Sequence, residues 1–444
     1  MGLVKRTYTD RETVITAENL NEIQDAIIAL EDGLFSVDND KSGAVITITD
    51  AAKRGFRSLN IFGKTTQNGT PTPDAPVDLV SAGRSGQIAV EVFKENVLRV
   101  TATSKTVNGV TFTINADKSI TVNGTATEQT VFTVSALEFP FQSDFILSGC
   151  PKGGSGSTYS LVAAYHDVTS SAWVTEEYDI GNGLVIKGDA TRKTKVSILI
   201  RKGVVASNLV FYPMLRPATV SDATYEQCVS QSMTISTPTG LPGIPVTTGG
   251  NYTDANGQQW VCDEIDFARG VRIIRIAMET VRVARAFSET PDWAGRFVCG
   301  SFMSSNCKSG TAVAISNFAK WKTWGTTGIQ GEECFAMSGK NLYYTPSTPM
   351  TADEVSTMFA EMIASDTPPV IAAQLEAPIE TPLTEEELAA YAALHTYKDH
   401  TTVSNSGHAY MELEYVMDAK KYIDSLIGSA GGGASAGIHN ATVE

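Results

Sequence analysis

Short stretches in which apolar and polar residues alternate recur along most of this chain. Residues 107–114 and 120–124 keep the period of two expected of half-buried strands, and the turn-forming residues 115–119 lie between them. We therefore predict a β-hairpin. Further alternating runs, each bounded by Gly, Pro, Asn, Asp or Ser, lie at residues 131–135, 145–148, 159–165, 172–178, 184–187, 195–200 and 208–212. Because no helix-length apolar period separates them, residues 96–227 are predicted to form a jelly-roll-like β-sandwich.

The segments on either side of this predicted sandwich have similar compositions. Residues 59–80 and 233–246 are dense in Gly, Pro, Asn, Asp or Thr, which favour turns, so we predict loop-rich connectors there. Residues 88–93 and 271–286 alternate as strands, and residues 254–257 form a predicted turn between two strands. Since an inserted domain needs its two ends close together, the flanks are predicted to fold as one β-rich collar.

Helical periodicity is confined to a few segments. Near the N-terminus, Thr16 is positioned to cap a helix of about two heptads. Its seam would consist of Leu20, Ile23, Ile27 and Leu30, continued by Leu34. Mixed Leu and Ile at the seam favour a trimeric bundle and make these residues a predicted oligomer interface. The alternative is an amphipathic helix packed on its own chain, because two heptads alone are too few to hold chains together.

Two later helices carry start signals of their own. The pairs Thr351 with Glu354 and Thr384 with Glu387 are capping boxes, which predict helices through residues 363 and 394. Strands are expected at residues 370–375 and 410–416, and a short helix at residues 418–427.

These elements predict a mainly β, multidomain fold class with five parts. They are an N-terminal helix and attachment region (1–56), the collar (57–95 plus 228–277), the sandwich (96–227), a small α+β domain (278–382), and a C-terminal helix and strand segment with a flexible Gly/Ala/Ser tail (383–444).

Composition narrows the possible partners. The chain has 444 residues, of which 42% are apolar and 19% charged, as in folded proteins with more than one core. Its net charge of -15 repels phosphate backbones, so nucleic acid is not expected as a partner. No apolar run is long enough for a bilayer and the N-terminus lacks the apolar core of a signal peptide, so no membrane insertion is expected. Six widely spread cysteines without a Cys-x-x-Cys pair predict free, mostly buried thiols.

No set of residues has the pattern of an active site. The densest acidic group is Asp263, Glu264 and Asp266. In a strand Asp263 points away from the other two, so the group is interpreted as a solvated strand edge and not as a carboxylate pair facing across a sugar. The histidines have no metal-ligand spacing, and nucleophile and nucleotide motifs are missing. We expect no catalytic residues, no metal, no cofactor and no enzyme activity.

A second acidic group lies in the predicted sandwich. Glu176, Glu177 and Asp179 alternate along one strand and are interpreted as a polar face, with a cation or sugar-hydroxyl site as the alternative.

Sugar binding by a sandwich requires aromatic platforms, because pyranose faces are apolar, together with polar groups for the hydroxyl rims. Tyr165, Trp173 and Tyr178 lie on or between adjacent predicted strands, and His166 and Asp167 are close in sequence. These five residues form the predicted ligand-binding surface. Core packing is the alternative for each aromatic residue.

Several segments resemble one protein family. Residues 106–126, 208–215 and 223–226 resemble carbohydrate-binding-module-like sandwich domains of tail and baseplate proteins from phages and prophages of gut bacteria. Residues 59–80, 249–270, 381–397 and 410–427 resemble other segments of the same proteins, in the same order.

This resemblance implies a virion structural protein of the tail tip, baseplate or tail fibre, made in the bacterial host cytoplasm. Its implied partners are other tail or baseplate proteins and a host cell-surface carbohydrate, and its implied assembly is a homotrimer. The alternatives are a glycan-degrading tail spike enzyme, a purely structural baseplate scaffold and a bacterial surface adhesin.

Overall fold

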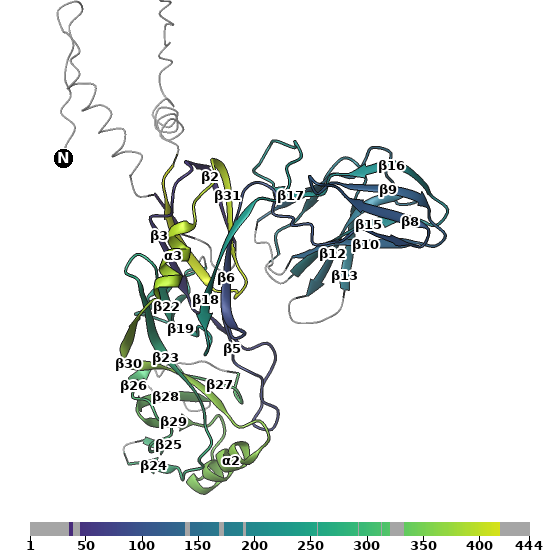
Figure 1. The fold of residues 1–444 in the computed structure, drawn as a ribbon. Helices are drawn as coiled ribbons and strands as arrows, with labels where there is room; N and C mark the ends of the chain where they lie inside the picture. Colours follow the sequence, from purple (N-terminus) through teal and green to yellow (C-terminus); the bar gives the residue numbers. More distant parts are fainter. Residues whose placement is uncertain are drawn as a thin grey trace, which may run out of the picture.

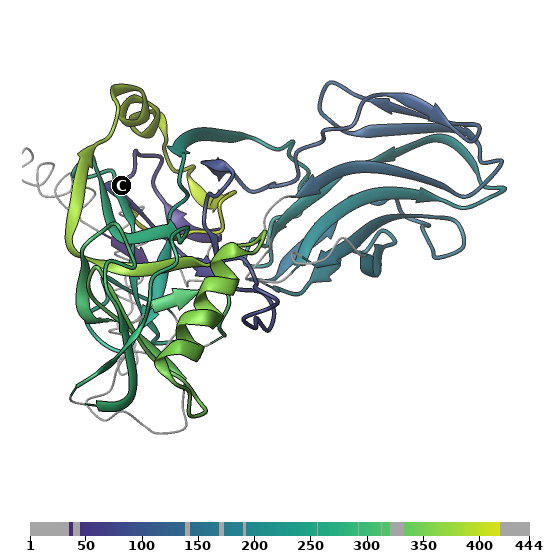
Figure 2. The ribbon, with the colours of Figure 1, turned by 90° about the horizontal axis from the view of Figure 1, so that it is seen from below.

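A computed structural model describes residues 35–38, 45–137, 143–167, 173–189, 192–254, 256–291, 293–311, 313–319 and 333–417. The described chain is mainly β with two helices, which confirms the predicted fold class. It has a central body, a sandwich that projects to one side of that body, and a distal domain at the lower end of the body (Figure 1). Figure 2 shows the sandwich well separated from the rest when the molecule is seen from below.

Some predicted elements lie outside the described residues. They are the N-terminal helix with its seam Leu20, Ile23, Ile27 and Leu30, the helix at 418–427 and the Gly/Ala/Ser tail.

Two sheets enclose the core of the central body. One is the first part of a 12-stranded sheet, in the order β1-β32-β3-β22-β23-β30, and the other has the order β18-β6-β31-β2. Buried side chains such as Ile61, Ile88 and Leu413 pack between them. The bounds of these strands are β1 Phe35–Asp38, β2 Val45–Ala51, β3 Ser58–Phe62, β6 Gly86–Phe93, β18 Ser230–Thr237, β22 Glu264–Asp266, β23 Val271–Thr280, β30 Val370–Pro382, β31 Asp399–Asn405 and β32 Tyr410–Tyr415. Two small sheets complete the body: β4 Thr65–Thr66 with β5 Val80–Ser81, and β19 Gly243–Val246, β21 Gln259–Cys262 and β20 Tyr252–Thr253.

The sandwich is attached through two neighbouring strands. β6 leads into it and β18 leads out of it, and the two strands pair in antiparallel fashion. On its other side β6 pairs with β31, which pairs with β2. The central body is therefore larger than the predicted collar, because strands from the regions 1–56 and 383–444 lie in the same sheet.

The sandwich consists of two layers around one core. One layer is the sheet β10-β15-β12-β13, and the other contains the sheets β16-β9-β8-β7 and β14-β11-β17. Phe112 of β8 and Phe132 of β10 stack between the layers, with ring centroids 4.3 Å apart. The bounds are β7 Lys105–Val107, β8 Val110–Ile114, β9 Ile120–Thr125, β10 Thr130–Leu137, β11 Phe145–Ser148, β12 Tyr159–Asp167, β13 Trp173–Asp179, β14 Leu184–Ile186, β15 Arg192–Ile200, β16 Val205–Phe211 and β17 Met214–Pro217.

The predicted hairpin of the sandwich is present, but its first strand is shorter than expected. β8 pairs with β9 as predicted. The stretch predicted as one strand, 107–114, instead turns at Asn108 and Gly109, with φ of 46° and 80°, so that β7 pairs with β8. Positive φ at both positions is what a two-residue hairpin turn requires, and Asn-Gly favours it.

The distal domain continues the long sheet of the central body. β23 and β30 run into it without a break, so the predicted boundary between residues 277 and 278 lies inside β23. The bounds of its other elements are β24 Ser288–Thr290, β25 Trp293–Cys299, β26 Cys307–Thr311, β27 Val313–Ile315, β28 Cys334–Gly339, β29 Asn341–Thr345 and α2 Ala352–Ala364.

Both capping boxes are confirmed. In α2, Thr351 accepts from the Glu354 amide while the Glu354 side chain accepts from the Thr351 amide, and the helix buries Val355, Phe359 and Met362. The second box, at Thr384, opens α3, Glu385–Ala393, on the central body.

Two strands of the central body differ from the prediction. Residues 59–80 were expected to be a loop-rich connector, yet β3 at their start lies between β32 and β22, with Leu59 and Ile61 buried. The neighbouring Gly and Pro residues mask this short alternation in the sequence. β31 has few apolar residues and was not predicted, although it is central in its sheet.

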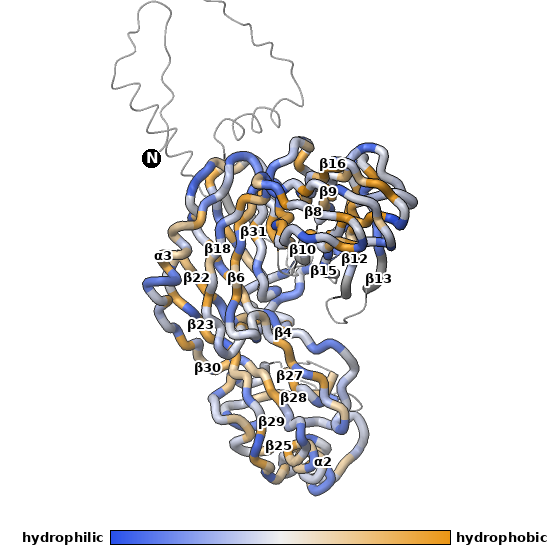
Figure 3. The backbone as a smooth tube through the Cα atoms, turned by 45° about the vertical axis from the view of Figure 1, so that its right-hand side comes forward, coloured by the Kyte–Doolittle hydropathy of each residue, from blue (hydrophilic) through white to orange (hydrophobic). Residues whose placement is uncertain are grey.

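Apolar positions recur along strands of all three units, for example β6, β9 and β27 (Figure 3). The six cysteines are free, four buried and two half-buried, as predicted. In the described part of the chain, no helix is long and apolar enough to cross a membrane.

Candidate functional site

The fold brings the five predicted sugar-binding residues into one hairpin. Tyr165, His166 and Asp167 end β12, and Trp173 and Tyr178 lie on β13, the neighbouring edge strand. His166 is opposite Trp173 in the register, and Tyr178 is opposite Val162. The positions of the side chains of His166, Asp167 and Trp173 are outside what the structure describes.

Tyr165 is part of the core and not of a binding surface. Its side chain is only 5% exposed and belongs to the apolar cluster between the layers. Its hydroxyl donates a hydrogen bond to the Glu177 carboxylate. The prediction that Tyr165 contacts a ligand is therefore wrong, because strand alternation turns this position inward.

Tyr178 has the opposite orientation. Its side chain is 36% exposed, and its hydroxyl donates a 2.9 Å hydrogen bond to the Glu176 carboxylate. This hydrogen bond, with a smaller contribution from burial, raises the pKa of Tyr178, whereas the nearby Arg201 guanidinium acts in the other direction. The hydroxyl of an exposed aromatic ring thus has both a carboxylate and a guanidinium as neighbours.

Arg201 was not among the predicted site residues. It directly follows β15, and its Nε donates to the Gly156 carbonyl at 2.8 Å while its Nη1 donates to the Gln129 side chain. Two hydrogen bonds to separate loops hold the guanidinium in place. The sequence has no signal for this contact, because Arg201 and Tyr178 come from strands that are not neighbours in their sheet.

Small side chains lie beside Tyr178 on the outer face of this sheet. These side chains are nearly inaccessible and belong to Ser160, Val162 and Ser197. The alternate residues Leu161 and Ile198 point to the inner side of the sheet and lie in the core of the sandwich. The hydroxyls of Ser160 and Ser197 have no hydrogen-bond partner in the described part of the chain. These small residues are covered, so they add almost no accessible surface beside the Tyr178 ring.

Asp179 is a structural anchor. Its Oδ1 accepts from the amides of Gly181 at 2.8 Å, Asn182 at 3.2 Å and Gly183 at 2.9 Å, and its Oδ2 accepts from the amide of Cys150 at 2.9 Å. The side chain is fully buried. The predicted polar face of Glu176, Glu177 and Asp179 is thus divided, because only Glu176 is exposed with Tyr178.

The acidic group at Asp263, Glu264 and Asp266 is not a solvated strand edge. β22 lies between β3 and β23 inside the long sheet, and all three side chains are buried. Glu264 forms a 2.8 Å ion pair with Arg275. This part of the prediction is wrong because the sequence does not show how many strands flank β22.

Asp263 closes a bulge in the neighbouring strand. Its Oδ1 accepts hydrogen bonds from the amides of Arg275 at 2.7 Å and Ile276 at 2.9 Å, where the pairing of β23 with β30 shifts register. Burial raises the pKa of Asp263 to about 7, although these amides and Arg275 act against the shift. A carboxylate used in this way supports the sheet and faces no substrate.

No cluster of His, Cys, Asp and Glu suited to a metal ion occurs among the described residues.

No protein-family model matches the chain, and no curated protein matches it. Among solved structures, the chain is similar to the infectious bursal disease virus VP2 subviral particle at 8% identity, covering 89% of this chain and 86% of that chain. The TM-score of 0.14 is too low to indicate a shared fold.

Proposed function

We propose that this chain is a structural component of a phage or prophage tail tip or baseplate that presents its sandwich to a host cell-surface carbohydrate. Four separated resemblances to phage tail proteins, which follow one another in the same order, support the assignment to a virion. The sandwich enters and leaves the body through one pair of strands, which suits a domain that projects toward a target (Figure 2).

The observation that carries carbohydrate recognition is the exposed Tyr178 ring, whose hydroxyl has Glu176 and Arg201 as neighbours. An aromatic ring offers an apolar platform for a pyranose face. A carboxylate accepts from sugar hydroxyls and a guanidinium donates to them, so the ring has polar groups of both kinds at its margin.

A glycan array probed with the full chain tests this proposal. Tyr178→Ala should abolish the signal, and Tyr178→Phe should keep most of it because the stacking surface remains. Tyr212→Ala is the matched control, since Tyr212 is also exposed on the sandwich but pairs with Tyr225 instead. Loss of binding in Tyr212→Ala but not in Tyr178→Ala would show that the glycan binds at Tyr212 and Tyr225 instead. No binding to any glycan of the array would favour a scaffold role.

The non-enzymatic part of the proposal has its own test. Incubation of the protein with host capsule or cell-wall glycan should release no new reducing ends. Their appearance would favour the tail spike enzyme.

Trimeric assembly is also part of the proposal, and it rests on the sequence pattern that predicts the N-terminal helix. Identical weak sugar sites gain avidity when they are presented together, which suits a trimer. Light scattering should give three chains per particle. Ile23→Asp or Ile27→Asp should weaken assembly by placing charge in the seam, and a monomeric wild type would contradict the proposal.

A further inference from the structure

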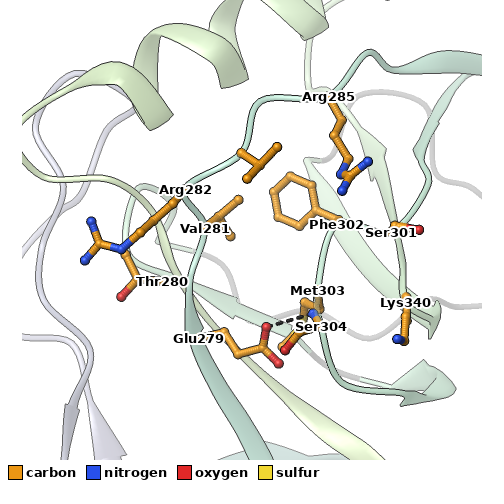
Figure 4. Close-up of a pocket in the computed structure, with 11 residues that line it drawn as sticks. Glu279, Thr280, Val281, Arg282, Arg285, Ser301, Phe302, Met303, Ser304 and Lys340 are labelled. Carbon is orange, nitrogen blue, oxygen red and sulfur yellow. Dashed lines mark hydrogen bonds between the residues drawn. The ribbon is translucent and has the colours of Figure 1, made fainter.

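A pocket of about 310 Å³ opens in the distal domain (Figure 4). It lies between residues 279–285, at the end of β23 and in the following segment, and residues 301–304, which precede β26, with Lys340 from the β28–β29 turn. This volume is at the lower end of the range for small-molecule sites, about 300–1,000 Å³. Neither the sandwich nor the acidic group of β22 contributes to it.

The floor of the pocket is apolar and firmly held. Val281, Phe302 and Met303 are buried there. The Phe302 ring packs edge-on against Phe359 of α2, with centroids 5.7 Å apart, and also contacts Phe287. A floor that belongs to the domain core is preformed, so a ligand need not order it on binding.

Three cations line the rim of this pocket. Arg282, Arg285 and Lys340 are exposed, and none of them forms an ion pair with a described residue, although the chain as a whole carries a net charge of -15. Figure 4 shows Arg285 beside the Phe302 ring with Lys340 on the same side, and Arg282 near Thr280 on the other side. An unpaired guanidinium next to an apolar floor is suited to a carboxylate, which it can bind through two parallel hydrogen bonds.

The rim is also fixed in position by local bonds. Ser301 has a positive φ of 51°, an uncommon conformation for a residue other than glycine, and its amide donates to Asn341 Oδ1 at 3.1 Å. The amide of Met303 donates to the Lys340 carbonyl at 3.2 Å. These bonds tie the 301–304 segment to the turn that carries the Lys340 ammonium.

One carboxylate, that of Glu279, also lines the pocket. Glu279 accepts hydrogen bonds from the amides of Ser304 at 2.8 Å and Ser305 at 3.0 Å. Burial acts to raise the pKa of Glu279, but these hydrogen bonds together lower it below its usual value, so the group is ionised at neutral pH. Each Glu279 oxygen keeps a lone pair that can accept a hydrogen bond from a ligand hydroxyl, while the cations of the rim attract a negatively charged group.

We propose that this pocket binds a carboxylate-bearing sugar ring, the chemistry of a uronic acid unit in an acidic polysaccharide. The carboxylate bonds to Arg285, the cation beside the Phe302 ring, and the less polar face of the sugar ring lies over Val281 and Phe302. This is a second carbohydrate site, in a different domain from the Tyr178 surface and independent of it.

Saturation-transfer NMR with the full chain and glucuronate tests this site, with glucose as the neutral analogue. Glucuronate should bind and glucose should not. Arg285→Gln should weaken binding by about tenfold or more, since a hydrogen bond to a charged group contributes at least that factor. Lys308→Gln is the matched control, because it removes one exposed cation of the same domain outside the pocket. It should leave binding unchanged.

Several outcomes would overturn the proposal. Equal binding of glucose and glucuronate would exclude recognition of the carboxylate, and so would an Arg285→Gln variant that binds like wild type. Displacement of glucuronate by an equal concentration of inorganic phosphate would show a general anion site. Failure of this site is distinguishable from failure of the sandwich site, since Tyr178→Ala should leave glucuronate binding intact. Loss of binding in Tyr178→Ala would place the ligand on the sandwich instead.

Discussion

Phe93, the last residue of β6, lies directly opposite Ser230, the first residue of β18. Residues 94–229 therefore begin and end at neighbouring positions. We predict that replacing them with Asn-Gly closes β6 and β18 into a two-residue hairpin and leaves a folded remainder. Circular dichroism should retain the β signal, with one cooperative thermal transition for the body.

Excision also has an expected cost. Phe93 and Val45 pack against the core of the sandwich, and its removal exposes them. Exposure of each of these two side chains should lower the free energy of unfolding of the remainder by about 1.5–3 kcal/mol. The matched variant combines the excision with Phe93→Thr. It should be more soluble than the excision alone, because it replaces an exposed aromatic side chain with a polar one. A remainder without cooperative unfolding in either form would contradict the prediction.

Core truncations should act on one unit at a time. Phe132 belongs to the core of the sandwich and Phe359 to the separate core of the distal domain. Truncation of either to Ala should cost about 3–5 kcal/mol in its own unit. Limited proteolysis should then cleave Phe132→Ala within residues 96–227, and Phe359→Ala within the distal domain. Cleavage of both units by either variant would show that they unfold together.

The buried Asp263 predicts a pH-dependent difference in stability. Burial raises its pKa from the ordinary 3.8 to about 7 in the folded protein, so between these pH values the folded state holds a proton that the unfolded state releases. The resulting stability is fully present below pH 4 and is lost as the pH rises through about 7, by at most about 1.4 kcal/mol per pH unit.

Asp263→Asn isolates this effect, because an amide oxygen can still accept from the amides of Arg275 and Ile276. Urea unfolding between pH 5 and 8 should show wild type losing stability relative to this variant as the pH increases. Parallel curves would mean that Asp263 titrates at the same pH in both states.

The two capping boxes should differ in importance. Thr351→Ala removes the cap of a helix that buries Val355, Phe359 and Met362, and should lower the free energy of unfolding by about 1 kcal/mol. Thr384→Ala removes the same bonds from α3, which buries none of its residues, so it should fray that helix with a smaller effect on global unfolding. Urea titration of both variants compares them directly, and equal losses would contradict the prediction.

Features set by neighbouring residues were accessible from the sequence. The two capping boxes and the hairpin of β8 and β9 form where predicted, because a cap needs a partner three residues away and a hairpin needs turn residues between two alternating runs. The alternation around Tyr165 and Tyr178 also located the strands β12 and β13. These are local interactions, so the sequence by itself determined them.

Which side of each strand faces inward was decided only by the tertiary structure. Tyr165 and Tyr178 both lie in runs that predict half-buried strands, yet one is in the core and the other at the surface. β31 is buried although it is mostly polar, because β6 and β2 supply hydrogen bonds on both sides and Asn405 bonds to Ala409. Asp263 is buried for the same reason, since its partners are backbone amides of the next strand. Burial of polar groups depends on partners contributed by other segments, which the local sequence does not show. Folding alone likewise brings Arg201 beside Tyr178 and gathers the cations around Phe302.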